Sequence, residues 1–361
     1  MTALPAALPP GSTIGILGGG QLGRMLAEAA STLGFDVAIL EPQAECPASR
    51  VAAHHIQAAY DDVDGLKALA ALSDVVTTEF ENVPASVVAV LEAEGVRVAP
   101  NGRALATAQD RVDEKTYLNS VGATTVAFAK VDDLADLHAA IETLGLPALL
   151  KTRREGYDGK GQVWIKSAQD AASALESLGG RAAILEAKAS FTRELSVIAA
   201  RSVDGAVAVY PLGQNIHENG ILRTTIAPAN VDVATQERAV AIATNILNGL
   251  DYVGVIGVEL FDLGDRLLVN EIAPRVHNTG HWTQEGCSCD QFEQHIRAIA
   301  GWPLGSTQAH AKVEMTNLLG DEINDWANMA ADPSVHLHFY GKREARAGRK
   351  MAHINKVLES L

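Results

Sequence analysis

The sequence predicts a chain of three parts that combines α/β and α+β architecture. Apolar strands alternate with amphipathic helices over residues 1–108, which is typical of a small parallel sheet with helices on both faces. Residues 109–301 continue the alternation but end in two short strands of hairpin type, and a small mixed region, 302–361, completes the chain. We therefore expect a Rossmann-like domain, a central α+β domain and a small C-terminal domain.

The first region opens as a βαβ unit. Thr13–Leu17 is an apolar strand that runs into Gly18-Gly19-Gly20-Gln21-Leu22-Gly23, helical spacing follows over Arg24–Leu33, and Val37–Leu40 is a strand again. The later elements of this region are helices at Val63–Leu72 and Pro84–Glu94 and strands at Asp74–Thr78 and Val96–Ala99. Pro100-Asn101-Gly102 marks the exit from the doubly wound unit.

The second region begins with a helix at Asp110–Ser120. The elements expected after it are helices at Leu134–Leu144, Ala168–Leu178 and Thr235–Leu247, and strands at Ala148–Lys151, Gln162–Ile165, Ala182–Glu186, Glu194–Ala200 and Ala206–Pro211. Two further strands, Val255–Phe261 and Arg266–Ile272, are joined by the turn-rich segment Asp262-Leu263-Gly264-Asp265 and read as a hairpin.

The composition narrows the range of partners. Of the 361 residues 47% are hydrophobic, which is ample for a full core, and the formal charge is −15. This acidity argues against nucleic acid or an anionic membrane as a partner, so small anionic substrates need a local basic pocket. Residues 1–10 have no basic segment and no apolar run of membrane length, and three cysteines cannot form a disulfide framework. We expect a cytoplasmic protein.

The glycine pattern Gly18–Gly23 follows a strand and precedes a helix, as in dinucleotide-binding proteins. Glu41 ends the next strand, near the place of a ribose-binding acid. A glycine turn at a helix N-terminus accepts any phosphate, however, so binding of a monophosphate or simple tight packing are alternatives.

The stretch Val269–Trp282 combines a carboxylate, a guanidinium and an imidazole next to an apolar strand. If the hairpin turn centres on Asp265, Glu259 and Glu271 lie opposite each other on one face, where like charges repel. A divalent cation between them would remove the repulsion, and oxygen ligands with room for phosphate oxygens are typical of Mg²⁺ in a nucleotide site. Two solvated glutamates on an edge hairpin are the alternative.

The segment Lys151–Gln162 is a strand-end lysine followed by a loop with three glycines, and it holds four cations. Backbone amides of such a loop can surround a polyphosphate while the lysines neutralise its charge. The spacing of a Walker A loop is absent. A solvated basic hairpin is the alternative, although the glycines at Gly156, Gly159 and Gly161 indicate close backbone approach.

Other residues have weaker signals. Glu186 ends a strand and Glu194 opens the next, so these acids could hold an adenine amino group and ribose hydroxyls, although such glutamates are more often on the surface. His217 lies in a polar loop, where a structural role is more common. Glu79 and Glu81 follow a strand at the carboxyl end, where open α/β sheets bind ligands, but they could equally be ordinary acids before a helix.

Basic residues gather near the C-terminus. His338–Lys342 and Arg346–Lys350 combine cations with glycines, which is compatible with a pocket for a phosphate monoester or with a solvated face.

Together these motifs resemble those of the ATP-grasp ligases, and within them the N5-carboxyaminoimidazole ribonucleotide synthetases of bacterial purine biosynthesis. The resemblance covers nearly the whole chain. The segments that carry it are Gly18–Met25, Lys151–Gln162, Gly220–Thr225, Asn270–Thr283, and Tyr340-Gly341-Lys342 with Gly348-Arg349-Lys350-Met351. The resemblance implies an ATP-grasp fold, an N-terminal domain like that of biotin carboxylase, and a homodimer.

The resemblance also implies the chemistry. Bicarbonate attacks the γ-phosphate of ATP to give carboxyphosphate, whose carboxyl group passes to the amine of 5-aminoimidazole ribonucleotide, and Mg²⁺ is required. The residues that would hold ATP are Arg111, Lys151, Gly156, Tyr157, Asp158, Gly159, Lys160, Gly161, Gln162, Glu186, Ala187, Lys188, Ala189, Glu194, His217, Asn270 and Glu271. Closure of the loop Arg153–Gly161 over the triphosphate would shield the labile intermediate from water.

Three smaller groups complete the implied site. Glu259 and Glu271 would hold Mg²⁺. The residues that would bind bicarbonate and carboxyphosphate are Arg275, His277 and Asn278. The residues that would hold the ribonucleotide are Gln21, Glu79, Glu81, Lys342 and Arg349, the last two on its phosphate.

Two positions depart from the family pattern. Glu155 stands where a small residue, usually glycine, is expected, and Ala273 stands where related carboxylases such as biotin carboxylase carry an asparagine metal ligand. A second Mg²⁺ would then depend on water or on Asn270.

Four alternatives stay open at this point. They are a formate-using glycinamide ribonucleotide transformylase of the same superfamily, an NAD-dependent oxidoreductase built on Gly18–Gly23, a non-catalytic nucleotide sensor, and a zinc site formed by Cys287, Cys289, His281 and His295.

Overall fold

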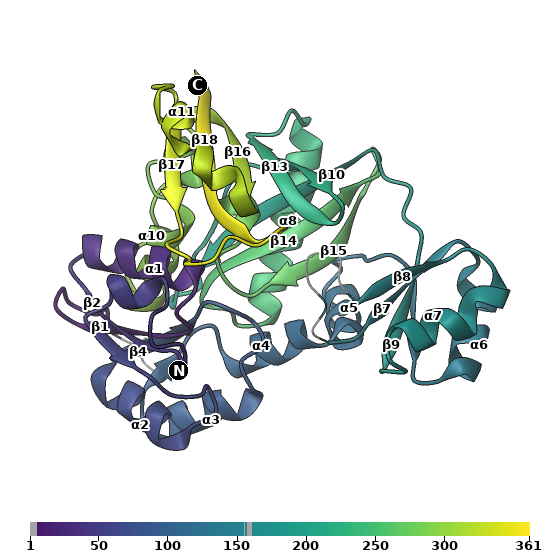
Figure 1. The fold of residues 1–361 in the computed structure, drawn as a ribbon, viewed down its shortest axis with the longest axis horizontal. Helices are drawn as coiled ribbons and strands as arrows, with labels where there is room; N and C mark the ends of the chain where they lie inside the picture. Colours follow the sequence, from purple (N-terminus) through teal and green to yellow (C-terminus); the bar gives the residue numbers. More distant parts are fainter. Residues whose placement is uncertain (1–5, 155, 157–160) are drawn as a thin grey trace.

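The computed structural model describes residues 6–154, 156 and 161–361, and within these it contains three β-sheets (Figure 1). Five residues of the expected triphosphate loop lie outside the described residues: Glu155, Tyr157, Asp158, Gly159 and Lys160. The expected closure of that loop is therefore not addressed. Within the described part of the chain, no helix combines the length and the apolar character needed to span a membrane.

The N-terminal sheet is parallel, with the strand order β3-β2-β1-β4-β5. Its strands are β1 (Thr13–Leu17), β2 (Asp36–Leu40), β3 (His54–Ile56), β4 (Val75–Thr78) and β5 (Arg97–Val98). Helix α1 (Gln21–Thr32) packs on one face, and α2 (Val63–Leu72) with α3 (Ala85–Ala93) packs on the other. Neighbouring side chains such as Val75 and Val76 enter different cores, as strand geometry requires. The expected doubly wound unit is confirmed.

The large sheet is antiparallel, with the order β15-β14-β10-β12-β13-β16-β18-β17 and with β11 on β10. Its strands are β10 (Arg193–Arg201), β11 (Val207–Val209), β12 (Gly213–Glu218), β13 (Ile221–Ala227), β14 (Gly254–Asp262), β15 (Leu267–Ala273), β16 (Ala311–Leu319), β17 (Val335–Phe339) and β18 (Lys350–Ser360). Helix α8 (Val233–Gly249) covers one face, and α10 (Gln291–Ala300) covers the other and also packs on α1.

The large sheet is shared by the central and C-terminal regions. Strand β13 pairs with β16 from Thr224 opposite Thr316 to Ala227 opposite Val313, so the C-terminal strands extend the sheet that carries the hairpin (Figure 1). The expected boundary at residues 301 and 302 falls between α10 and β16. The division into domains at 1–108, 109–301 and 302–361 stays a prediction.

The third sheet is small and antiparallel, with the order β6-β9-β7-β8. Its elements are β6 (Phe128–Val131), β7 (Ala148–Thr152), β8 (Gln162–Ile165), β9 (Ala183–Ala187), α6 (Leu134–Leu144) and α7 (Ala171–Ser177). Leu150 packs into the core beneath the two helices, whereas Leu149 and Lys151 line cavities on the opposite face. In Figure 1 this unit lies to one side of the large sheet, beyond α5 (Arg111–Ser120).

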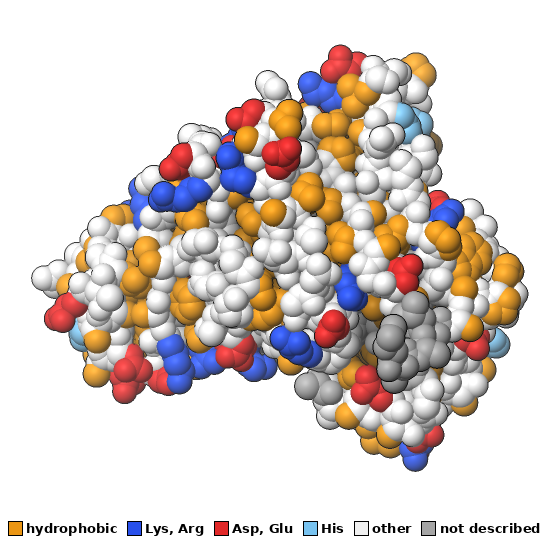
Figure 2. Space-filling view, turned by 180° about the vertical axis from the view of Figure 1, so that it is seen from behind, with side chains coloured by type: hydrophobic (Ala, Val, Ile, Leu, Met, Phe, Trp, Pro, Cys, Tyr) orange, Lys and Arg blue, Asp and Glu red, His pale blue; other side chains and the backbone are white. Residues whose placement is uncertain are grey.

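Short elements connect these units. They are α4 (Gly102–Gln109), α9 (Thr283–Gly286), α11 (Trp326–Ala330) and the 3₁₀ turns Ala48–Arg50, Ala168–Asp170, Asn278–Gly280 and Gly320–Asp325. On the face of the molecule shown in Figure 2, Lys and Arg side chains lie beside Asp and Glu side chains. Charges of the two signs are therefore interspersed on that face.

Candidate active site

A cavity of about 520 Å³ is lined by residues from all three sheet units. The expected site residues that it brings together are Gln21, Glu81, Arg111, Lys151, Gly156, Gln162, Glu194, His217, Glu259, Asn270, Glu271, Arg275, His277 and Asn278. They come from helix α1, from strand β7 and from the hairpin β14–β15, among other elements. Residues more than 300 positions apart along the chain therefore face one volume.

The hairpin places the two glutamates opposite each other. Strands β14 and β15 pair Glu259 with Glu271, as expected, but the pairing register is not constant along the hairpin, as it would be after a symmetric turn. Leu260 pairs with Val269, and the register then shifts by one residue, so that Asn270 is a β-bulge. Because a shift of one residue moves a side chain to the other face of a strand, the bulge is what puts both carboxylates on the cavity face.

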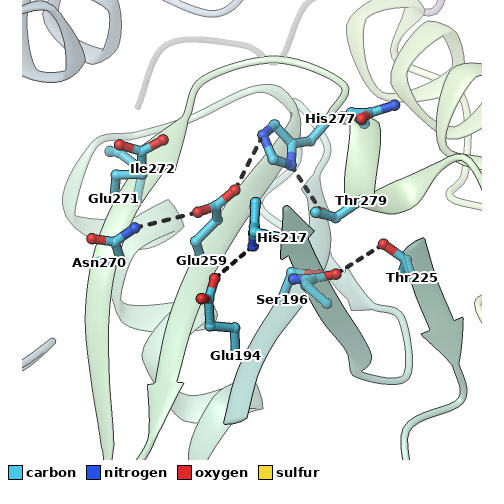
Figure 3. A network of polar contacts seen from close by, with 12 residues as sticks. Glu194, Ser196, His217, Thr225, Glu259, Asn270, Glu271, Ile272, His277 and Thr279 are labelled. Carbon is cyan, nitrogen blue, oxygen red and sulfur yellow. Dashed lines mark hydrogen bonds and ion pairs between the residues drawn. The ribbon is translucent and has the colours of Figure 1, made fainter. Parts of the chain in front are cut away.

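Figure 3 shows Glu259 between polar groups of its own hairpin and of the following segment. Its Oε2 accepts a hydrogen bond from Asn270 Nδ2 at 3.3 Å, and its Oε1 lies 3.8 Å from His277 Nε2. On the neighbouring strands β10 and β12, Glu194 Oε2 lies 2.7 Å from His217 Nδ1. His217 is therefore on a strand and not in the polar loop expected from the sequence.

The two hairpin glutamates have opposite pKa shifts. Burial raises the pKa of Glu259, and the neighbouring carboxylate of Glu271 raises it further. Burial acts in the same direction on Glu271, but Arg111, whose Nη1 lies 2.9 Å from Glu271 Oε2, outweighs it and lowers the pKa. The two carboxylates therefore repel each other across the hairpin, and a positive charge close to Glu259 would lower that repulsion.

A second cavity of about 440 Å³ adjoins the first, since Leu149, Lys151 and Trp164 line both. The rings of Phe191 and Phe261 stack here with their centroids 4.6 Å apart. The expected residues found in this second cavity are Lys151, Glu186, Ala187, Lys188 and Ala189. Glu186 Oε2 lies 2.7 Å from Lys151 Nζ. An apolar cleft with a few polar groups at its end suits a purine base.

Arg275, His277 and Asn278 follow strand β15 and meet groups from distant parts of the chain. Arg275 Nε donates to Glu81 Oε2 at 2.5 Å, and this guanidinium outweighs burial and lowers the pKa of Glu81. Burial, aided by Arg275, lowers the pKa of His277 to about 3, so its imidazole is neutral. The amide of Asn278 exchanges two hydrogen bonds with that of Asn317, at 3.0 and 2.7 Å.

Glu79 lies inside the glycine loop at the start of α1. Its carboxylate accepts hydrogen bonds from the backbone N–H groups of Gly20 and, at 2.6 Å, of Gly23. A Cβ atom on Gly18 would lie 2.4 Å from Glu79, so the side chain fills the loop. A carboxylate of the protein thus takes the place at the helix N-terminus that a phosphate takes in a dinucleotide site. The NAD interpretation of this motif does not fit.

The C-terminal cluster contributes one cation to the cavity wall, and it differs from those expected. Lys350 lines the main cavity. Lys342 Nζ donates to the carbonyl of Lys350 at 2.7 Å, while Arg349 is exposed and donates to the carbonyl of Glu344 at 3.0 Å. Gly161, Glu79, Lys342 and Arg349 are absent from the walls of both cavities among the described residues.

The zinc alternative is wrong. Among the residues that the structure describes, no group of three or more His, Cys, Asp or Glu side chains is arranged to hold a metal ion. His281 and His295 bond instead to Gln291 and to Thr77.

Three family models match the chain. A ribonucleotide synthetase preATP-grasp domain matches residues 12–109, an ATP-grasp domain matches 116–292, and a phosphoribosylaminoimidazole carboxylase C-terminal domain matches 314–361. The N5-carboxyaminoimidazole ribonucleotide synthase of Brucella melitensis biotype 1 is 52% identical over 354 residues, which are 97% of this chain and 98% of that protein. The chain belongs to the N5-carboxyaminoimidazole ribonucleotide synthases.

Solved structures of the family agree with the fold. The ADP complex of an N5-carboxyaminoimidazole ribonucleotide synthetase superposes with a TM-score of 0.94 at 41% identity, covering 99% of this chain and 94% of that one. The Aspergillus clavatus N5-carboxyaminoimidazole synthase, in complex with ADP and 5-aminoimidazole ribonucleotide, has a TM-score of 0.90 at 33% identity, with coverages of 96% and 94%. The chain is an ATP-grasp ligase that carboxylates 5-aminoimidazole ribonucleotide in purine biosynthesis, with ATP as a substrate.

Several residues of the cavities in this synthase were not expected from the sequence. They are Lys350, Trp164, Phe191, Phe261 and Leu222 on the cavity walls, and Asn317 behind Asn278. The aromatic pair had a usable signal, because Phe261 lies two residues after Glu259 in strand β14 and therefore shares its face of the strand. Asn317 had none, since its partner lies 39 positions away in the sequence.

Proposed function

We propose that the carboxyl group comes from bicarbonate and passes through carboxyphosphate to the ribonucleotide amine. Bicarbonate oxygen attacks the γ-phosphorus and ADP leaves, after which the amine nitrogen attacks the carboxyl carbon and phosphate leaves. The observation that carries this proposal is that one cavity joins the hairpin carboxylates, the cation Lys151 and the Arg275 group. Such a volume can hold a triphosphate end and an oxyanion side by side.

ATP is proposed to lie across the two adjoining cavities. The adenine base would enter the cleft at Phe191, beside Glu186 and the backbone of Ala187–Ala189. Lys151 lines both cavities and so stands where the phosphates would pass from one to the other. Arg111, also on the wall of the main cavity, would add a second cation.

Mg²⁺ is proposed to bind between Glu259 and Glu271. The residues fit the ion because two carboxylates face each other across the bulged register, where burial and then the neighbouring Glu271 raise the pKa of Glu259. A second Mg²⁺ would depend on water or on the amide oxygen of Asn270, because Ala273 offers no ligand; the amide nitrogen of Asn270 donates to Glu259 Oε2. Held there by Glu259 and Glu271, the metal would supply positive charge that offsets the negative charge developing on the transferred group.

Arg275, with His277 and Asn278, is proposed to hold the bicarbonate and the carboxyl group in transit. An arginine is suited to a planar anion because its donors match two oxygens at once. In the structure Glu81 occupies one edge of the guanidinium. The neutral imidazole of His277, held at Nδ1 by Thr279 Oγ1 at 2.9 Å, leaves Nε2 directed toward Glu259 (Figure 3).

The ribonucleotide is proposed to lie at the junction of the N-terminal and C-terminal regions. Gln21 and Glu81 face the cavity from the N-terminal unit, and Lys350 faces it from β18. Lys342 and Arg349 lie in the same basic cluster and would meet the phosphate of the ribonucleotide. Glu79 would act from beneath the loop, by fixing the start of the helix that carries Gln21.

The reaction is tested by the release of ADP from ATP, Mg²⁺ and bicarbonate, with and without 5-aminoimidazole ribonucleotide. We expect strong stimulation by the ribonucleotide and none by formate with glycinamide ribonucleotide. Absence of stimulation by 5-aminoimidazole ribonucleotide would overturn the assignment of the cavity.

The metal site is tested by Glu271→Gln. This variant should lose turnover because it removes half of the carboxylate charge at the proposed site, while thermal unfolding stays close to that of the parent. Asp265→Asn is the matched control, since Asp265 lies in the turn of the same hairpin with its side chain 75% exposed. Near-normal activity of Glu271→Gln would show that the metal lies elsewhere.

The homodimer rests on the family resemblance and the cytoplasmic location on the composition of the chain, and both stay predictions. Sedimentation of the purified protein at micromolar concentration tests the first of them.

A further inference from the structure

Strand β15, which carries Glu271, lies at the end of the large sheet. Its inner edge pairs with β14, so backbone groups on its outer edge need other partners. Val269 N–H donates to the carbonyl of Thr124 at 2.8 Å. The two groups nearest Glu271 on this edge, the carbonyl of Asn270 and the N–H of Ile272, bond instead to side chains of helix α5.

These side chains are Glu114 and Lys115, and both are buried. Glu114 Oε1 accepts from Ile272 N–H at 2.7 Å, and Lys115 Nζ donates to the Asn270 carbonyl at 2.9 Å. Arg111 precedes them by three and four positions, which places all three on one face of the helix. One turn of α5 thus holds the side chain of Glu271 and the backbone on both sides of it.

Lys115 also joins the hairpin to the small sheet. Its Nζ lies 3.2 Å from Glu186 Oε1, and the other oxygen of Glu186 lies 2.7 Å from Lys151 Nζ. A fully buried ammonium is costly unless it is paired and hydrogen-bonded. Here a carbonyl of the bulge and a shared carboxylate serve that purpose, so removal of Lys115 alters the bulge directly.

The bulge decides which face Glu271 occupies. If the pairing of Leu260 with Val269 continued without a shift, Glu259 would lie opposite Asn270, and Glu271 would point to the other face of the strand. The bonds from α5 hold the two backbone groups on either side of Glu271, and one of these, the Asn270 carbonyl, belongs to the bulged residue itself. They therefore stabilise the shifted register over the regular one.

We propose that Glu114 and Lys115 are positioning residues for the metal-binding carboxylates, because they fix the bulge at Asn270 and keep Glu271 opposite Glu259. This inference rests on the proposed Mg²⁺ site. Neither residue lines either of the two cavities in which the substrates are proposed to bind. Both act through the geometry of the hairpin.

The test uses two variants that lose the hydrogen-bonding group and one variant that keeps a hydrogen-bond acceptor. Lys115→Met and Glu114→Met keep an unbranched side chain but remove the bonds to the hairpin, whereas Glu114→Gln keeps an oxygen that can accept from Ile272 N–H. Loss of a group that orients metal ligands typically weakens metal affinity by about 10- to 100-fold. Thr116→Ala, an exposed position on the same helix, is the control.

The readout is Mn²⁺ binding in the presence of ADP, followed by electron paramagnetic resonance without turnover. We expect the dissociation constant of Mn²⁺ to rise about 10- to 100-fold in both methionine variants and only a few-fold in Glu114→Gln. The KM for 5-aminoimidazole ribonucleotide should stay unchanged, since its proposed partners lie elsewhere. A purely structural role would lower the melting temperature without changing the Mn²⁺ affinity of the folded protein.

Two outcomes would overturn the inference: Mn²⁺ affinity in Glu114→Met equal to that of the parent, or an equal loss in Glu114→Gln and Glu114→Met. This comparison stands even if Lys115→Met fails to fold. Failure of the metal site itself gives a different result, because Glu271→Gln would then bind Mn²⁺ as tightly as the parent protein does.

Discussion

His295 joins the N-terminal sheet to the large sheet, and it gives the structure a defined pH dependence. The ring is fully buried. Its Nδ1 accepts from Val255 N–H at 3.0 Å, so the proton of the neutral ring is on Nε2, which donates to Thr77 Oγ1 at 2.8 Å. Burial lowers the pKa of His295 to about 3.

The ordinary pKa of histidine, about 6.5, applies to the unfolded chain. Between pH values of about 6.5 and about 3, His295 carries a proton in the unfolded chain but not in the folded protein. The contribution of His295 to stability is thus complete above the unfolded pKa and declines as the pH falls. Between pH 7.5 and 5.5 the decline is about 1.4 kcal/mol for this one group.

The perturbation is His295→Asn, in which the amide oxygen can still accept from Val255 N–H but the bond to Thr77 is lost. A lost buried hydrogen bond with a small cavity costs about 2 kcal/mol at pH 7.5. Because asparagine does not titrate, the deficit against the parent should shrink to about 0.6 kcal/mol at pH 5.5. Other buried histidines are present in both the parent and the variant, so their contributions cancel in the difference of the two unfolding free energies.

The assay is urea unfolding at the two pH values, followed by tryptophan fluorescence. His138→Asn, at an exposed position on α6, is the matched control for the substitution itself. If the deficit of His295→Asn were the same at pH 7.5 and 5.5, the assignment of a neutral, buried His295 would be refuted.

Two further predictions concern the base cleft and the glycine loop. Phe191→Ala removes the ring that stacks on Phe261 and should raise the KM for ATP roughly tenfold, corresponding to about 1.4 kcal/mol, while the KM for 5-aminoimidazole ribonucleotide stays constant in steady-state kinetics. Gly23→Ala places a Cβ 2.8 Å from the carbonyl oxygen of Gly18. It should lower the free energy of unfolding by about 1–3 kcal/mol, which is measured as a fall in melting temperature. An unchanged melting temperature would contradict this packing.

Much of the fold could be predicted because local patterns and tertiary structure agree in most elements. The alternation in residues 1–108 predicts the parallel sheet, although α1 begins at Gln21, three residues before the expected start, since its first turn lies within the glycine motif. The sequence pattern predicts no strand where β12 lies, and it predicts a loop at His217. The segment Gln214–Glu218 is mostly polar, so its strand depends on pairing with β10 and β13 and has no apolar alternation to reveal it.

In the candidate site, too, features that follow from spacing along the chain could be predicted, whereas features that depend on distant partners could not. A turn centred on Asp265 predicts that Glu259 and Glu271 lie opposite each other, and they do. In the structure, however, the turn is closed by a hydrogen bond from Leu263 N–H to the carbonyl of Arg266, and the bulge at Asn270 then brings the two glutamates opposite each other. A bulge depends on partners outside the strand, here Lys115, and spacing within the hairpin does not reveal it. Contacts such as Arg275 with Glu81 span 194 positions and depend on domain packing.

The continuity of the large sheet limits how this chain can be cut or recombined. Strand β13 has β12 on one side and β16 on the other, so a truncated protein ending before residue 302 would leave the edge of β13 at Thr224–Ala227 without its partner strand. Exposed edges of this kind invite pairing between molecules. Exchange of the C-terminal segment between relatives should therefore conserve the register of β13 with β16, or the product will associate through that edge.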